Sequence, residues 1–258
     1  MDQRAADGVS IAGIGLTIGD VERAAAFYAA LGFARVAPRR LALGGFSLEL
    51  TPATGAAYPV RRAANDPWFQ HFAVAVADID AAAAVALAAG ATPISRGGPQ
   101  RLPPNTGSVV AWKFRDPDGH PLELSLIPGG GWLRDATAGA VFLGIDHTAI
   151  AVADLPVSRA WYEAHGFRET GRSTNTGPEQ DRLDGLDGVT VEIVAMALPG
   201  AGPHLELLAY RTPGAAAPRA VADGDVAATT TWLTGGGAAV FRDPDGHRFA
   251  LTDARPRP

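Results

Sequence analysis

Cysteine is absent from the 258-residue chain. Disulfide bonds, thiolate nucleophiles and zinc–thiolate sites are therefore excluded, because each of them needs a cysteine sulfur. Lysine occurs only once, at Lys113, and arginine supplies the other cationic side chains. The formal net charge is −5. This balance argues against nucleic acid as the main partner, since phosphate binding requires a basic surface.

Long apolar runs are also missing. The longest one, Ala81–Ala89, is too short to span a bilayer. The segment Met1–Gly8 is polar and lacks the apolar stretch of a secretory signal peptide. From these absences we expect a cytoplasmic protein that does not bind membranes.

The chain does contain a repeated hexapeptide. Arg-Asp-Pro-Asp-Gly-His stands at Arg115–His120 and at Arg242–His247, and the offset of 242 − 115 = 127 residues is nearly half of the chain. Such a spacing predicts a tandem duplication. The composition of the hexapeptide favours a tight turn between two strands. His120 and His247 end these turns, so we expect both to be structural.

A second repeat is visible at finer grain. The apolar segment Ile14–Ile18 predicts a strand, Asp20 a helix N-cap, and Val21–Leu31 a helix with apolar residues at helical spacing. Gly32 ends this helix, because glycine readily adopts the left-handed conformation that follows a helix. Asp154 repeats Asp20 at an offset of 154 − 20 = 134. The repeated unit is β-α-β-β-β, and it occurs four times.

The offsets also show where the units differ in length. Leu48-Glu49-Leu50 matches Leu205-Glu206-Leu207 at an offset of 205 − 48 = 157. The third unit therefore has 157 − 134 = 23 extra residues, mostly in Ser173–Gly188, where we expect a flap. The fourth unit is 157 − 127 = 30 residues shorter than the second, which leaves no room for its helix.

Together these residues resemble the vicinal oxygen chelate superfamily, which includes glyoxalase I, bleomycin-resistance proteins and extradiol dioxygenases. The resemblance rests on Ile145-Asp146-His147 with Asp154, on Trp161-Tyr162, and on the two hexapeptide turns. It implies an α+β fold in which the four units pair into two curled mixed-sheet domains. We expect these domains at 1–128 (units one and two) and at 140–258 (unit three with its insertion and a truncated unit four).

In that family the metal ligands come from the first and the last strand of each unit. The first-strand position lies seven residues before the capping aspartate, and the last-strand position is the glutamate between two leucines. The resemblance therefore implies a divalent metal ion (Fe, Mn, Ni, Zn or Co), since imidazole and carboxylate ligands suit all of these ions. The implied ligands are His71, Glu49 and Glu123 in the first half of the chain and His147 and Glu206 in the second half.

Neither half of the chain keeps the whole ligand set. Gly13 stands at the first-strand position of unit one, and Ala250 at the last-strand position of unit four. A variation in the second half is that His204 and Glu206 share one strand face and would form, with His147, a two-histidine, one-carboxylate set of the kind associated with non-haem iron.

Two function classes therefore stay open. The first is a metal-dependent enzyme of glyoxalase or dioxygenase type (a lyase, an isomerase or a ring-cleaving oxygenase) that acts on a small substrate chelating through adjacent oxygens. Glu49 would be its general base, and Trp68, Phe69 and Trp112 would line its substrate pocket. The alternative is a metal-free small-molecule or antibiotic-binding (resistance) protein of the same fold. A homodimer is compatible with either class.

Overall fold

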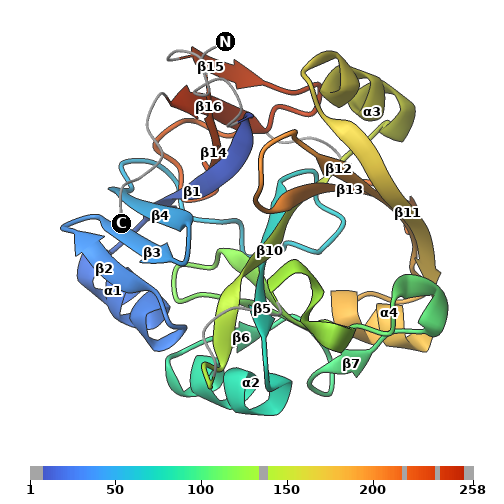
Figure 1. Cartoon of the computed structure of the whole chain (residues 1–258), viewed down its shortest axis with the longest axis horizontal. Coiled ribbons are helices and arrows are strands. Elements are labelled where there is room, and N and C mark those ends of the chain that lie inside the picture. Colours follow the sequence, from blue (N-terminus) through green and yellow to red (C-terminus); the bar gives the residue numbers. More distant parts are fainter. Residues whose placement is uncertain (1–7, 134–138, 217–219, 236–238, 253–258) are drawn as a thin grey trace, which may run out of the picture.

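A computed structural model describes residues 8–133, 139–216, 220–235 and 239–252 of the chain. It contains two mixed β-sheets with the longer helices at the periphery (Figure 1). Within the described residues, no helix is both long and apolar enough to cross a membrane.

The first two units each begin with a strand and a helix and end with an antiparallel hairpin. Unit one consists of β1 (Ser10–Ile18), α1 (Val21–Ala30), β2 (Ala34–Ala37), β3 (Arg40–Leu43) and β4 (Phe46–Pro52). Unit two consists of β5 (Phe69–Val76), α2 (Ile79–Ala88), β6 (Thr92–Pro93), β7 (Gln100–Arg101), the 3₁₀ turn η2 (Pro104–Thr106), β8 (Val110–Arg115) and β9 (Pro121–Leu126). A second 3₁₀ segment, η3 (Pro128–Leu133), follows unit two.

The third and fourth units differ in length, as the offsets predict. Unit three consists of β10 (Phe142–Ala151), α3 (Leu155–Ala164), β11 (Arg168–Thr176), α4 (Pro178–Asp184), β12 (Thr190–Ala197) and β13 (His204–Thr212). Unit four consists of β14 (Thr230–Thr234), β15 (Ala239–Arg242) and β16 (Arg248–Thr252), with no helix among its described residues. The α+β fold of four tandem units with a truncated fourth is confirmed.

Neither sheet joins unit one to unit two or unit three to unit four. The seven-stranded sheet has the order β15-β16-β14-β1-β4-β3-β2 and joins unit one to unit four. The nine-stranded sheet has the order β11-β12-β13-β10-β5-β9-β8-β6, with β7 beside β8, and joins unit two to unit three. The joining pairs are β1 with β14 and β5 with β10, both antiparallel. The first strands of the units thus pair across the two halves of the chain.

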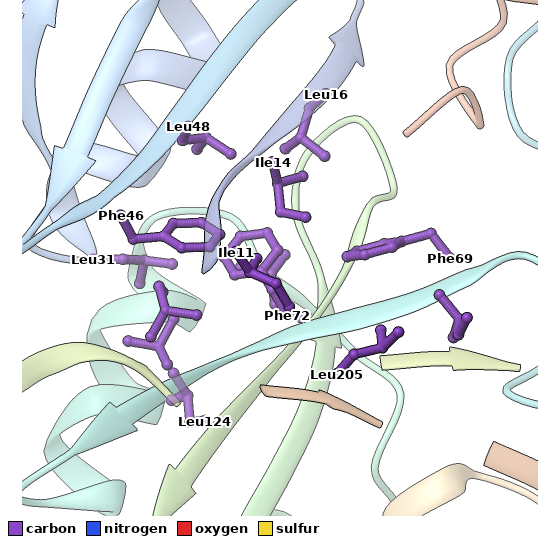
Figure 2. Close-up of a cluster of buried hydrophobic side chains, with 14 of the residues drawn as sticks. Ile11, Ile14, Leu16, Leu31, Phe46, Leu48, Phe69, Phe72, Leu124 and Leu205 are labelled. Atoms are coloured by element: carbon purple, nitrogen blue, oxygen red, sulfur yellow. The ribbon is translucent and has the colours of Figure 1, made fainter. Parts of the chain in front are cut away.

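The sequential units contact each other through their apolar faces. Phe72 of β5 packs against Tyr28, Phe33 and Phe46 of unit one, with ring centroids 6.2 to 6.5 Å apart. Figure 2 shows this region, where Ile14 and Leu48 of the seven-stranded sheet face the same core as Leu124 and Leu205 of the other sheet. The division of the chain at 128 and 140 stays a prediction.

The local signals of the sequence act as expected. The carboxylate of Asp20 accepts hydrogen bonds from the first amides of α1, Asp78 does the same for α2, and Asp154 for α3. Gly32 has a φ of 87°, which a residue with a Cβ rarely adopts, and it ends α1. Short-range chemistry therefore sets where these helices begin and end.

The first aspartate of each hexapeptide explains why the motif is repeated. One oxygen of Asp116 accepts backbone N–H bonds from Asp118, Gly119 and His120, which closes the turn. Its other oxygen accepts the Tyr28 hydroxyl at 2.7 Å. Asp243 repeats the arrangement and accepts the Tyr162 hydroxyl at 2.7 Å. The motif therefore hydrogen-bonds a turn of one unit to the helix of the preceding unit.

Asp243 should make the stability of the protein depend on acid pH. Burial alone would raise the pKa of Asp243, but the hydrogen bonds from His247 and from the hydroxyl of Tyr162 outweigh burial and lower it. A carboxyl whose pKa is lower in the folded state stabilises that state above its unfolded pKa, about 3.9, and this contribution is lost as the pH falls below that value.

We expect Asp243→Asn to lower the free energy of unfolding by about 1–3 kcal/mol at pH 7, the range for a lost buried charged hydrogen bond. The difference between variant and wild type should shrink when urea unfolding is measured near pH 3. An equal difference at both pH values would contradict the lowered pKa.

Candidate metal centre

Four of the predicted ligands meet in the nine-stranded sheet. His71 lies on β5, Glu123 on β9, His147 on β10 and Glu206 on β13. These strands are consecutive neighbours in the order β13-β10-β5-β9. All four side chains line one cavity of about 260 Å³.

Strand alternation explains why these side chains face the cavity. Leu122 and Leu124 flank Glu123 and belong to the hydrophobic core, as do Leu205 and Leu207 on either side of Glu206. Because successive residues of a strand point to opposite faces of the sheet, the glutamates must face the cavity. The leucine–glutamate–leucine pattern is the sequence signature of this placement.

The ligand atoms of His71, Glu123 and His147 lie close to one another, and Glu206 lies beside His147. Nε2 of His71 is 3.0 Å from Nε2 of His147. Oε2 of Glu123 is 3.6 Å from Nε2 of His71, and Oε2 of Glu206 is 3.6 Å from Nε2 of His147. His71, Glu123 and His147 each offer one atom to a group that lies within 4.8 Å.

The outer nitrogens of both imidazoles are already engaged. Nδ1 of His147 donates to Oδ2 of Asp146 at 3.0 Å, and Nδ1 of His71 donates to Oε1 of Gln70. If both imidazoles were neutral, the Nε2 lone pairs would therefore point towards each other. Two facing acceptors repel each other unless a proton or a metal ion lies between them. An acceptor on the far side of a ligand histidine is also the usual support of a metal site.

The separations between neighbouring ligand atoms fit a metal ion held by His71, Glu123 and His147. Zinc, for example, binds nitrogen and oxygen ligands at about 2.0–2.2 Å, so neighbouring ligand atoms at tetrahedral or octahedral angles lie roughly 3.0–3.6 Å apart. The observed separations of 3.0 and 3.6 Å fall in this range. The residues present therefore fit a divalent metal ion.

The electrostatics of the two halves of the cluster differ. Burial and the nearby Lys113 charge hold the pKa of His71 well below its usual range. Burial would also lower the pKa of His147, but the carboxylates of Glu206 and Asp146 outweigh it and raise that pKa. Burial raises the pKa of Glu123, whereas the positive charge of His147 lowers the pKa of Glu206 despite burial.

The equivalent positions in the seven-stranded sheet have lost this chemistry. The register places Glu49 opposite Gly15 and Ala250 opposite Trp232, just as Glu206 lies opposite Ala149. Glu49 lies in this other sheet, on β4. The structure therefore separates Glu49 from His71 and Glu123, with which it was expected to form one ligand set. Its carboxylate is 3.3 Å from the guanidinium of Arg40.

The first-strand positions of that sheet cannot hold a ligand either. A Cβ at Gly13 would collide with the backbone oxygen of Ser47, so no histidine fits there without a backbone shift. In unit four the register puts Thr230 at the matching position, opposite Gly15. The indole of Trp232 lies over Gly15, where a Cβ would come within 2.9 Å of Nε1. Of these four positions in the seven-stranded sheet (Gly13, Glu49, Thr230 and Ala250), only that of Glu49 carries an imidazole or carboxylate side chain.

Comparison with known proteins agrees with the fold and with the repeat. The sequence profile described as the Glyoxalase/Bleomycin resistance protein/Dioxygenase superfamily matches residues 10–124 and again residues 144–251. The chain belongs to this superfamily. No curated protein matches the chain.

Solved structures of the glyoxalase superfamily share the whole fold. Glyoxalase I from Zea mays is 19% identical, with a TM-score of 0.60 over 97% of this chain and 94% of that chain. A Bacillus subtilis protein described provisionally as a dioxygenase is 16% identical, with a TM-score of 0.55 over 95% of this chain and 85% of that one. At such identities the likeness shows the fold alone.

In this member of the glyoxalase superfamily, the aromatic residues predicted to bind substrate lie outside the 260 Å³ cavity. Trp112 is buried in the core and stacks on Phe114, with ring centroids 4.6 Å apart. Trp68 and Phe69 line a different cavity. His204 lies beside the cluster, with its Nε2 3.5 Å from Oε1 of Glu206.

Sequence reasoning missed a buried polar network behind the ligands. The Lys113 ammonium lies 3.9 Å from Oε2 of Glu123 and donates to Oδ1 of Asp184 at 2.7 Å. The Tyr210 hydroxyl donates to the other oxygen of Asp184 at 3.2 Å and accepts from Gln70 at 3.1 Å. Asp184 ends α4, so the segment predicted as a flap contributes a helix whose last residue supports the ligands of unit two.

Proposed function

We propose that this protein is a metal-dependent lyase or isomerase of glyoxalase type that acts on a small substrate chelating through two adjacent oxygens. The observation that carries the proposal is the compact group of His71, Glu123 and His147, with Glu206 beside His147, in the lining of one cavity. A divalent ion held there would supply positive charge to stabilise negative charge that develops on substrate oxygens.

The composition of the ligand set favours lyase or isomerase chemistry over oxygen chemistry. Non-haem iron oxygenases use two histidines and one carboxylate. Here two carboxylates accompany the two histidines, and His204 sits beside Glu206 instead of facing His71. No described residue provides a thiolate or another redox-active side chain at the cavity.

The chain's own residues would move the substrate proton. Glu123 is restrained on both oxygens, since the Ser125 hydroxyl donates to Oε1 at 2.6 Å and Lys113 lies beside Oε2. Among the described residues, Oε1 of Glu206 has His204 beside it at 3.5 Å, and the side chain of Glu206 is 20% exposed against 9% for Glu123. We therefore assign the general-base role to Glu206 in place of Glu49.

The direct test of the proposal is metal binding. Purified protein dialysed against Ni²⁺, Co²⁺, Zn²⁺, Mn²⁺ or Fe²⁺ under anaerobic conditions should retain about one equivalent of at least one ion. Chelation should then abolish turnover of a 2-oxoaldehyde–thiol adduct, a compound class with two adjacent oxygens. Binding of less than a tenth of an equivalent of every ion would overturn the proposal and favour a metal-free binding protein.

The two glutamates should respond differently to removal of their charge. Glu206→Gln is expected to lower kcat by at least about 100-fold, the scale of a lost general base, while the metal content falls less. Glu123→Gln should mainly reduce the metal content, because Glu123 is the more restrained ligand. Elemental analysis and single-turnover kinetics of both variants separate the roles, and identical losses in the two variants would contradict this assignment.

A further inference from the structure

A second cavity is separate from the candidate metal centre. It has a volume of about 420 Å³, and none of the four metal-ligand candidates lines it. Its walls are mainly apolar and include Trp68, Phe69, Ile150, Ala227 and Ala228. Its polar lining residues include His247, from the second hexapeptide turn. Pockets of roughly 300–1,000 Å³ commonly hold small molecules.

The tandem repeat supplies an internal comparison for His247. The equivalent residue, His120, is buried with both ring nitrogens engaged, since Nε2 donates to the carbonyl of Thr17 at 2.9 Å and Nδ1 accepts the Tyr58 hydroxyl at 3.2 Å. His247 uses Nδ1, which is 2.9 Å from Oδ2 of Asp243, and its buried Nε2 has no hydrogen-bond partner among the residues that the structure describes. The described structure thus satisfies both ring nitrogens of one copy of this histidine and leaves Nε2 of the other copy unsatisfied beside a cavity.

The hydrogen-bond pattern decides what the open nitrogen can accept. Oδ2 of Asp243 takes the Tyr162 hydroxyl and faces Nδ1 of His247, so Nδ1 must carry the proton that is donated to the carboxylate. Nε2 of the neutral imidazole is then an acceptor that lacks a donor. A buried acceptor without a partner is unfavourable by about 1–3 kcal/mol. A ligand with a donor group would remove that penalty.

The charged groups around the cavity already have partners. Arg242 donates to Asp223 and to the carbonyl of Gly246, and Arg248 lies 3.5 Å from Asp223. Both oxygens of Asp245 accept hydrogen bonds, from the amide of Ala153 and from the Ser158 hydroxyl. A cation at Asp243, Asp245 and His247 would have to displace these bonds. An uncharged ligand therefore fits this cavity better than an ion.

We propose that this cavity binds an uncharged aromatic alcohol, whose ring packs against the aromatic and aliphatic wall and whose hydroxyl donates to Nε2 of His247. Trp68 and Phe69 would contact the ring, and the volume accommodates one or two fused rings. The site is independent of the metal-dependent reaction proposed above, because it shares no lining residue with the metal cavity.

The experiment compares 2-naphthol with 2-methoxynaphthalene, which keeps the ring system but has no donor. Isothermal titration of the full chain should show 2-naphthol binding at one site per chain, about five- to tenfold more tightly than the methyl ether, as expected for one neutral hydrogen bond. Equal affinities, or no saturable binding of 2-naphthol, would overturn the proposal.

Three variants locate the bound ring. His247→Asn keeps an N–H that can face Asp243 but removes Nε2, so it should reduce the affinity for 2-naphthol to that for the methyl ether. Ala228→Leu fills the cavity and should remove binding of both probes without touching the hexapeptide turn. Glu206→Gln changes only the metal cavity and should bind 2-naphthol like the wild type. Loss of binding in Glu206→Gln, or its persistence in folded Ala228→Leu, would place the probe elsewhere and overturn the proposal.

Discussion

Replacing Lys113 by methionine is expected to lower the free energy of unfolding by about 3–5 kcal/mol, the range for removing one partner of a buried ion pair. The Lys113 side chain is 4% exposed, and its partner Asp184 is fully buried. Burial would lower the pKa of Lys113, but Asp184 and Glu123 outweigh burial and raise it. The lysine is therefore a cation that compensates two buried carboxylates.

A double variant isolates this charge effect from packing. In Lys113→Met with Asp184→Asn, the buried charge at position 184 disappears together with its partner, so much of the lost stability should return. Urea unfolding of the wild type, the two single variants and the double variant gives the coupling energy. Because the chain has only one lysine, isotope-labelled lysine also gives a single NMR signal that reports its charge. A loss below about 1 kcal/mol in Lys113→Met, the range of an exposed pair, would contradict the role.

The network around Asp184 also gives the insertion of unit three a physical meaning. Within α4, Gln180 donates to Oδ2 of Asp184 at 2.8 Å, and Tyr210 of β13 donates to the same oxygen. Tyr210 in turn accepts from Gln70, whose side-chain carbonyl accepts from His71. One carboxylate on α4 thus supports Glu123 through Lys113 and His71 through Tyr210 and Gln70. The insertion therefore supports the candidate metal ligands through hydrogen bonds and ion pairs.

The elements that sequence alone predicted are those set by neighbouring residues. Asp20, Asp78 and Asp154 cap helices because their carboxylates reach amides two or three residues ahead. The truncation of unit four was also readable, since a β-α-β-β-β unit cannot lose 30 residues and keep its helix. Chain spacing was sufficient for these features because no contact between distant segments is involved.

The grouping of the ligands depends on such a distant contact. His71 meets His147 only because β5 pairs with β10, which places Ala73 opposite His147. No local propensity encodes that pairing of strands. The sequence-based prediction paired unit one with unit two and therefore grouped Glu49 with His71. The pattern of losses contained the missing signal. Gly13 lies in unit one and Ala250 in unit four, whereas units two and three keep a ligand residue at every ligand position.

The position of Lys113 was a second signal that went unused. It lies between Trp112 and Phe114 in an otherwise apolar strand, in a chain that uses arginine for every other cationic side chain. Its neighbours face the core, so Lys113 points to the opposite face of the sheet, where it is buried against Asp184 of α4. A buried lysine needs a carboxylate partner. The partner, Asp184, could not be named from sequence because it lies on the inserted helix.

Replacing His147 by alanine is expected to weaken metal binding by more than about 100-fold. Loss of an outer partner of a ligand costs about 10–100-fold in affinity, so Asp146→Asn should have the smaller effect of the two. His147 contributes one of the two Nε2 atoms that lie 3.0 Å apart, and it is the contact between unit three and unit two at the cluster. Competition against a fluorescent chelator measures the affinities of both variants.

The tandem repeat offers a matched control for this prediction. Glu49→Gln changes the residue that occupies the Glu206 position in the other sheet, where it pairs with Arg40 at the surface. It should leave the metal affinity within about twofold, because surface ion pairs contribute little to stability and Glu49 faces no histidine in the described structure. If Glu49→Gln lost the metal and His147→Ala kept it, the metal would lie in the seven-stranded sheet. The pairing of unit two with unit three would then have no role in the chemistry.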